Sequence, residues 1–135
     1  MKKIVLLFIL MIVFVTGCSF SSENEVIEEK KTPAIEEVSI DEVKEIVDNY
    51  DEYPDVDIID VRSEEEFEEG HIEGALNIPL TYIEEINIDP ERKIILYCQS
   101  GRRSNDAAII LKELGYDNVL NMGSIENWPY DLVEE

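Results

Sequence analysis

Residues 93–104 read Lys-Ile-Ile-Leu-Tyr-Cys-Gln-Ser-Gly-Arg-Arg-Ser, and this stretch is the clearest indication of the fold. After Lys93, the next four residues form a short apolar run, and 93–97 has the length of a buried strand. Cys98 follows at once, and a helical pattern begins just after Gly101. The apolar residues of that pattern are Ala107, Ala108, Ile110, Leu111 and Leu114. Gly115 suits the C-terminal cap of this helix, so the sequence predicts a strand that leads directly into a helix.

The same alternation of strand and helix continues on both sides of this stretch. We expect further strands at 57–61, 75–79 and 118–121. Ser39 and Ser63 each begin a Ser-x-x-Glu capping box, which predicts a helix start at both places. The first of these helices has an apolar face made of Val43, Ile46 and Val47. Alternation over about 100 residues predicts an α/β fold, a small and mostly parallel sheet with helices on both faces, which binds ligands beyond the carboxyl ends of its strands.

The composition limits the class of protein. The chain has 135 residues, 44% of them hydrophobic, which is enough for the core of one domain. Its 32 acidic and 11 basic residues give a formal net charge of −21. We therefore expect no nucleic-acid partner, because such proteins neutralise phosphates with Lys and Arg.

The N-terminus has the pattern of an export signal. Lys2 and Lys3 precede an apolar run, Ile4–Val15, that is short for a membrane-spanning helix. The segment Val15-Thr16-Gly17-Cys18 resembles the bacterial lipobox. That resemblance implies a lipoprotein signal peptide at 1–17 and a Cys18 that carries fatty acyl chains such as palmitate. An uncleaved anchor helix is the alternative.

These N-terminal features predict the organisation of the chain and its location. Residues 18–37 comprise the lipidated cysteine and an acidic flexible tether, and 38–135 form the domain. Whether Cys18 is lipidated or the N-terminus stays as an uncleaved anchor helix, we expect the chain to be tethered to the cell membrane, with its domain outside the cytoplasm.

Cys98 lies between the end of the predicted strand and the start of a helix. Unpaired N–H groups of the first helical turn, and the positive end of the helix dipole, favour an anion at this position. Gly101 allows successive N–H groups to point toward one centre, and Arg102 and Arg103 add positive charge. These features favour a negatively charged sulfur and predict that Cys98 is a nucleophile rather than a structural thiol.

Several motifs, in this order, resemble the rhodanese family in its single-domain sulfurtransferase form. They are Asp60-Val61-Arg62, Glu66-Phe67, Gly70-His71-Ile72-x-Gly74-Ala75-x-Asn77-Ile78-Pro79, the loop 98–104, and Gly123-Ser124-Ile125-Glu126-Asn127-Trp128. The last is close to the Gly-Gly-x-x-x-Trp ending of many members. The resemblance covers roughly residues 35–133 and implies a rhodanese-like fold.

The resemblance also implies an activity, that of a thiosulfate sulfurtransferase. Cys98 would attack the sulfane sulfur of a donor such as thiosulfate, release sulfite, and pass the sulfur from its persulfide to a thiol acceptor. The implied substrate-binding residues are Gln99, Ser100, Gly101, Arg102 and Arg103. Their backbone N–H groups would hold the persulfide, and Arg102 or Arg103 would attract the anionic donor. Many members have Arg directly after the cysteine, so Gln99 leaves the donor preference open.

Four other residues have an expected role. By analogy with the family, Asp60 and Arg62 support the active-site end of the sheet. His71 is the only histidine, and its place in a turn motif favours a structural hydrogen bond over a general base. Trp128 is expected in the core or as a lid. One histidine and one domain cysteine give too few ligands for a zinc site, and no cofactor is implied.

Two other functions remain as alternatives. Dual-specificity cell-cycle phosphatases share the fold, but their loop is one residue longer and places an arginine six positions after the cysteine. Here that position is Ser104. A non-catalytic or regulatory module, or a persulfide carrier that receives sulfur from an unknown protein partner, is the second alternative.

Overall fold

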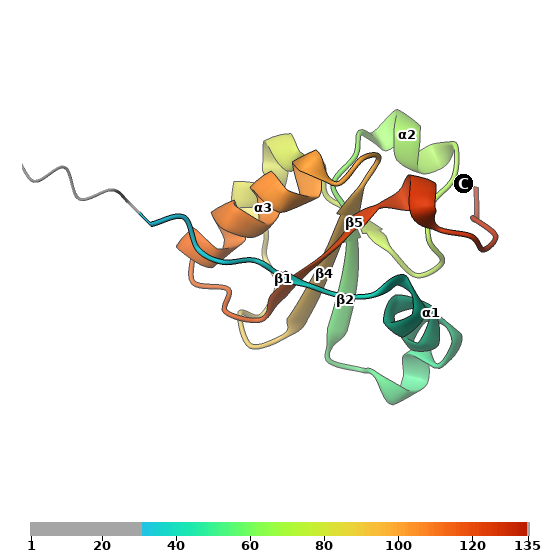
Figure 1. Cartoon of the computed structure of the whole chain (residues 1–135), viewed down its shortest axis with the longest axis horizontal. Coiled ribbons are helices and arrows are strands. Elements are labelled where there is room, and N and C mark those ends of the chain that lie inside the picture. Colours follow the sequence, from blue (N-terminus) through green and yellow to red (C-terminus); the bar gives the residue numbers. More distant parts are fainter. Residues whose placement is uncertain (1–30, 135) are drawn as a thin grey trace, which may run out of the picture. The chain divides into compact units, whose positions relative to one another are not determined.

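The computed structural model describes residues 31–134 and shows a five-stranded parallel sheet with strand order β1-β5-β4-β2-β3 (Figure 1). The strands are β1 (Glu36–Glu37), β2 (Val56–Asp60), β3 (Leu76–Asn77), β4 (Lys93–Cys98) and β5 (Val119–Ser124). The α-helices are α1 (Ile40–Asp48), α2 (Glu64–Glu68) and α3 (Arg102–Glu113). Three short 3-10 helices complete the fold: η1 (Tyr50–Glu52), η2 (Leu80–Glu85) and η3 (Ile125–Asn127). The expected α/β fold is confirmed.

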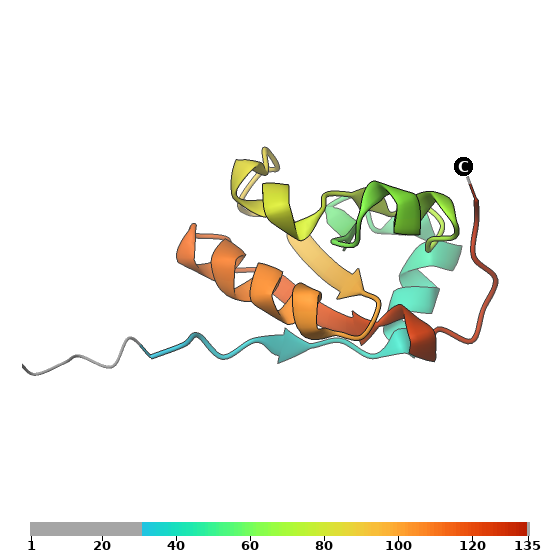
Figure 2. The same cartoon turned by 90° about the horizontal axis from the view of Figure 1, so that it is seen from above.

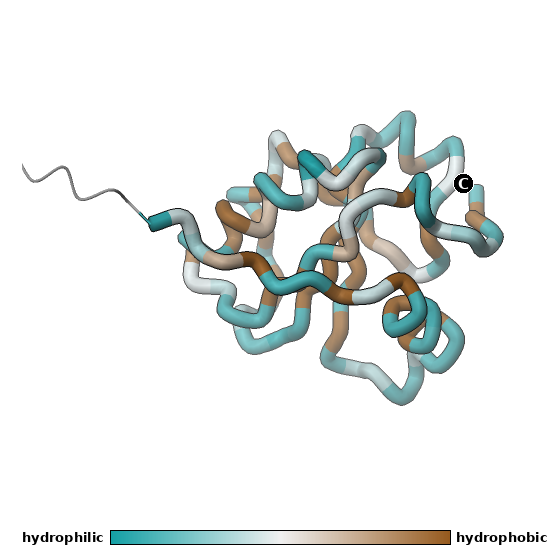
Figure 3. Tube along the Cα trace, viewed as in Figure 1, coloured by the Kyte–Doolittle hydropathy of each residue, from teal (hydrophilic) through white to brown (hydrophobic). Residues whose placement is uncertain are grey.

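The central strands are apolar on both faces because both faces are covered. In β4, Ile95 and Tyr97 join one core cluster, whereas Ile94, Leu96 and Cys98 join the other. Successive strand residues point to opposite faces, which explains this division. The first cluster packs against α1 and α2, and the second packs against η2 and α3. Figure 1 shows α1 and α3 on opposite sides of the sheet, and in Figure 3 the hydrophobic colouring follows the central strands.

The first strand begins before the predicted domain boundary. Glu36 and Glu37 pair in parallel with Leu120 and Asn121 of β5 at the sheet edge (Figure 2). The expectation that the tether extends through Glu37 is therefore wrong at its last residues. Both glutamates are exposed, so they show no apolar pattern that predicts a strand. The expected signal peptide at 1–17 and the lipidated Cys18 lie outside the described residues.

The capping boxes explain where two helices begin. At α2, Ser63 Oγ accepts the Glu66 N–H, and the Glu66 carboxylate accepts the Ser63 N–H, so the predicted box is complete. At α1, Ser39 Oγ accepts the Glu42 N–H, which is half of a box. Between residues 31 and 134, no helix is long and apolar enough to cross a bilayer.

Two expected details differ in the structure. The strand predicted at 75–79 is limited to β3, because the Ala75 N–H turns back to the Ile72 carbonyl. Leu114 was expected on the apolar face of the helix, but it is 51% exposed just past the last turn of α3.

A register shift in the β4–β5 pair shapes the edge where ligands are expected. Leu96 pairs with Asn121, whereas Tyr97 pairs with Gly123 and Cys98 with Ser124. The extra residue, Met122, makes a bulge at this place. The bulge sets Ser124 directly beside Cys98 at the carboxyl end of the sheet.

Candidate active site

The Cys98 thiol lies in a loop that connects β4 to α3. Its Sγ accepts hydrogen bonds from the backbone N–H groups of Gly101 at 3.1 Å and Ser104 at 3.4 Å. Gly101 is the N-cap of α3 and has φ +91°, in the left-handed region that favours glycine. A side chain there would also lie 3.5 Å from the Cα of Gly123. The loop thus directs two N–H donors at one sulfur atom beside a helix N-terminus.

Ser104 belongs to this site, although sequence reasoning did not place it among the substrate-binding residues. Its hydroxyl accepts from the Cys98 thiol at 3.6 Å and donates to the Gly101 carbonyl at 3.0 Å. Both Ser104 and Cys98 are fully buried. The sequence signal for this role is the place of Ser104 in the first turn of the helix, six residues after the cysteine.

The two loop arginines have different surroundings. Arg103 forms a two-point ion pair with Glu66 of α2, with N–O distances of 2.6 and 2.7 Å. The hydrogen bonds with Arg103 lower the pKa of Glu66 to about 2, and the same contact raises the pKa of Arg103. Arg102 is exposed and makes no ion pair with any residue from 31 to 134. Of the two arginines expected to attract the donor, Arg102 is the one whose charge is not already paired.

Asp60 and Arg62 form a buried ion pair at the end of β2. The Arg62 guanidinium donates to Asp60 Oδ2 at 2.7 Å and to the Gly70 carbonyl at 2.7 Å. Its Nη1 also contacts Oε1 of Gln99 at 3.5 Å, which links the pair to the Cys98 loop. The structure therefore brings Asp60 and Arg62 beside the loop and shows no direct contact between either of them and Sγ within the described chain.

Gln99 is held in place from three sides. Its Nε2 donates to Glu126 Oε1 at 2.9 Å, its Oε1 faces Arg62, and its carbonyl accepts from Ser124 Oγ at 2.6 Å. Ser124 Oγ also accepts the Glu126 N–H at 3.1 Å. The Gln99 side chain thus connects the loop to Arg62 at the end of β2 and to Glu126 in η3.

His71 and Trp128 lie away from the sulfur, in the packing of the domain. His71 Nδ1 donates to the Phe67 carbonyl at 2.9 Å, and its ring stacks on Phe67 with centroids 3.6 Å apart. Its backbone exchanges two hydrogen bonds with Val133, which fixes the C-terminal segment. Trp128 is buried in the core cluster beneath α1. This geometry agrees with a structural hydrogen bond for His71 and with a core position for Trp128.

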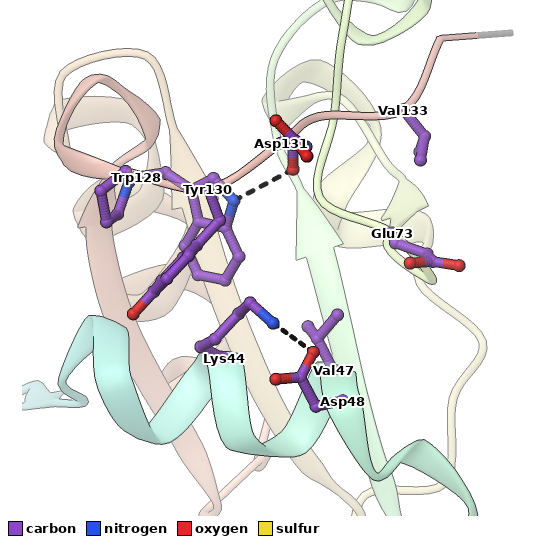
Figure 4. Close-up of a pocket in the computed structure, with 9 residues that line it drawn as sticks. Lys44, Val47, Asp48, Glu73, Trp128, Tyr130, Asp131 and Val133 are labelled. Carbon is purple, nitrogen blue, oxygen red and sulfur yellow. Dashed lines mark hydrogen bonds and ion pairs between the residues drawn. The ribbon is translucent and has the colours of Figure 1, made fainter.

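A cavity of about 430 Å³ lies between α1 and the C-terminal segment, and the Cys98 loop does not line it. Figure 4 shows Trp128 and Tyr130 on one side of it and Lys44 on α1 facing them. The Lys44 ammonium lies over the Tyr130 ring at 5.0 Å and pairs with Asp48. In the described part of the chain no group of His, Cys, Asp and Glu is arranged to hold a metal ion.

The site has the parts needed for nucleophilic chemistry at sulfur. It has one thiol, backbone N–H donors directed at it, a helix N-terminus that favours negative charge, and one arginine nearby that no described residue pairs with. The position six residues after the cysteine is a serine, which supplies no guanidinium to bind a phosphate. The arrangement suits a sulfur atom with negative charge better than a phosphoryl group.

Comparison with known proteins gives a consistent set of relatives. The model of the rhodanese-like domain family matches residues 39–130. The putative sulfur carrier protein YrkF of Bacillus subtilis is 39% identical over 78% of this chain, which spans 53% of YrkF. Thiosulfate sulfurtransferase PspE of Escherichia coli is 38% identical over 51% of this chain and 70% of its own length. The structure of the human single-domain sulfurtransferase TSTD1 superposes with a TM-score of 0.60 and 28% identity, over 70% of this chain and 96% of that one. These relatives support a sulfurtransferase.

Proposed function

Since the chain belongs to the rhodanese-like domain family, we propose that it transfers sulfane sulfur from a donor such as thiosulfate to a thiol acceptor. The observation that carries this proposal is the Sγ of Cys98, which receives two backbone N–H groups at the N-terminus of α3. Relatives named as thiosulfate sulfurtransferases support the choice of donor.

The proposed first step is a displacement on the donor. The Cys98 thiolate attacks the outer sulfur of thiosulfate, an S–S bond forms, and the sulfur–sulfur bond of the donor breaks. Its electron pair leaves with sulfite, so charge and atoms balance. Arg102 attracts the dianion, and the N–H groups of Gly101 and Ser104 stabilise the negative charge on the persulfide.

A sulfite-release assay tests this function. The wild-type protein should release sulfite from thiosulfate when cyanide or a thiol is present, and Cys98→Ser should release none. An aryl phosphate serves as the alternative substrate for a phosphatase, and we expect no turnover of it. Sulfite release by Cys98→Ser at the wild-type rate would remove the proposed mechanism.

A persulfide carrier is the second candidate, because the relative YrkF is named a putative sulfur carrier and Cys98 is fully buried. The sulfite assay separates the two functions. An enzyme releases many sulfites per protein molecule with a small thiol as acceptor, whereas a carrier releases one and stops until a specific partner accepts the sulfur.

We also propose that the chain is anchored to the outer side of the cell membrane through lipid on Cys18. The support is the pattern of residues 1–18 alone, a charged start, an apolar run and a lipobox-like end. Labelling cells with a radioactive fatty acid tests it. Cys18→Ala should lose the label, and equal labelling of variant and wild type would contradict the anchor.

A further inference from the structure

A groove of about 400 Å³ lies beside the Cys98 loop, on the side of β5 and β1. Ser100 and Gly101 of the loop form one wall, and Gly123 and Ser124 of β5 form another. The β4–β5 register makes Ser124 the direct neighbour of Cys98. The groove therefore borders the segment that surrounds the reactive sulfur.

The groove has a fixed shape with polar groups available to a ligand. Asn121 Oδ1 accepts the Gly123 N–H at 3.0 Å, which holds the β5 wall in place. Ser100, Asn105 and Asn127 also line the groove. Among the described residues, none of these three side chains has a hydrogen-bond partner. Their hydroxyl and amide groups match the hydrogen-bonding pattern of peptide bonds.

The lining of the groove is acidic. Among the described residues that line it, Glu37 is the one charged residue, so these residues supply no cation to attract an anion. Arg62 and Arg103 do not line the groove, and they are paired with Asp60 and Glu66. The groove therefore favours a neutral or positively charged ligand over a negatively charged one.

We propose that this groove binds the peptide part of a neutral or cationic peptide thiol, the acceptor of the second transfer step. This inference rests on the proposed sulfur transfer. The acceptor thiol gives its proton to the anionic outer sulfur of the Cys98 persulfide, its own sulfur attacks that outer sulfur, and a new S–S bond forms on the acceptor. The bond between Sγ and the outer sulfur breaks, its electron pair returns to Sγ as the thiolate, and the proton leaves with the transferred sulfur. Asn105 and Asn127 bind amide groups of the acceptor on either side of its cysteine.

Transfer to designed peptide thiols tests the proposal. The Cys98 persulfide is formed with thiosulfate, freed of donor, and mixed with N-acetyl-Lys-Cys-Lys-amide, the matching Ala and Glu peptides, or 2-mercaptoethanol. We expect the Lys peptide to react at least about 5-fold faster than the Glu peptide, and Glu37→Gln to reduce this preference. Asn105→Trp, which fills the groove, should lower the ratio of Ala-peptide rate to mercaptoethanol rate about 10-fold.

Asn87→Trp is the matched control, because Asn87 is an exposed asparagine that does not line the groove. It should keep the wild-type ratio. An unchanged ratio in Asn105→Trp, or a Glu peptide that reacts as fast as the Lys peptide, would overturn the proposal. Failure of thiosulfate to load Cys98 would instead contradict the proposed function. In that case, calorimetry of N-acetyl-Lys-Ser-Lys-amide with wild type and with Asn105→Trp still shows whether the groove binds the peptide, because this measurement needs no sulfur transfer.

Discussion

Arg102 and Arg103 are neighbours in the chain but belong to different parts of the site. Consecutive helical residues point in directions about 100° apart, so the two side chains do not share partners. Arg103 reaches Glu66 on α2, and Arg102 stays exposed. Arg103 therefore holds the loop against α2, and Arg102 offers its charge to a substrate.

This difference predicts separate kinetic effects. Arg102→Ala should raise the KM for thiosulfate about 10-fold with a smaller change in kcat, because it removes one charged contact worth about 1.4 kcal/mol. Arg103→Ala should mainly lower kcat, because it frees the loop that positions Sγ. Steady-state sulfite release measures both constants. Equal effects of the two variants on KM would show that both arginines bind the donor.

The Glu66–Arg103 pair also predicts a dependence of stability on pH. Hydrogen bonds with Arg103 lower the pKa of Glu66 from 4.5 to about 2. A lowered pKa stabilises the fold above pH 4.5, and this contribution is lost as the pH falls toward 2. Glu66→Gln should therefore lower the free energy of unfolding at pH 7 by no more than about 1 kcal/mol, since the pair is partly exposed. Urea unfolding at pH 7 and pH 2.5 should show most of this difference gone at the lower pH. If the difference in unfolding free energy between Glu66→Gln and wild type were the same at both pH values, the effect would come from the helix cap of α2 and not from the ion pair.

At the scale of elements, the loop depends on a backbone conformation that only glycine adopts without strain. Gly101 and Gly115 flank α3 with similar positive φ angles, +91° and +96°. A Cβ on Gly101 would meet the Gly123 backbone, whereas a Cβ on Gly115 would meet nothing within 4 Å. Gly115 is thus a control for the cost of the φ angle alone.

Both alanine variants should be destabilised by about 1–2 kcal/mol through the left-handed φ angle. Gly101→Ala should in addition lower sulfur transfer, because relief of the strain at its φ of +91° would turn away the N–H that donates to Sγ. Thermal unfolding and sulfite release measure the two effects. Full activity in Gly101→Ala would show that the loop geometry is not needed for transfer.

The sequence predicts those elements whose pattern is local. The β4 run, the Ser63 capping box and the glycine before α3 each act over a few residues, so the α/β fold and the position of Cys98 follow from them. Strand β1 is exposed, so its residues show no apolar pattern. It belongs to the sheet only through its backbone pairing with β5. The ion pair between Glu66 and Arg103 joins residues 37 positions apart, so only the folded chain shows it. The same holds for the β4–β5 bulge, which depends on how two strands align.

At the scale of the whole molecule, charge opposes the proposed donor. The formal net charge is −21, and removal of the two lysines in residues 1–17 with no acidic residue would lower it to −23. Arg62 and Arg103 are paired with Asp60 and Glu66, which leaves Arg102 to act at short range. An anionic donor therefore approaches against the long-range field of the protein.

This field predicts how the rate responds to salt. At low ionic strength, added salt should raise kcat/KM for thiosulfate, because salt screens the long-range repulsion more than the short contacts in the loop. The measurement is sulfite release across a series of sodium chloride concentrations, with dilute buffer as the reference. A rate that falls steeply with salt would mean that the positive charge near the loop dominates the approach of the donor.

Mass spectrometry of the protein after thiosulfate treatment shows whether the transferred sulfur passes through Cys98. We expect one added sulfur atom on the peptide that contains Cys98, removed by cyanide or dithiothreitol and absent from Cys98→Ser. Cys18→Ala should keep it, because the sulfur resides on the domain cysteine. A peptide of Cys98 that gains no sulfur, while sulfite is still released, would contradict a persulfide on Cys98 as the intermediate.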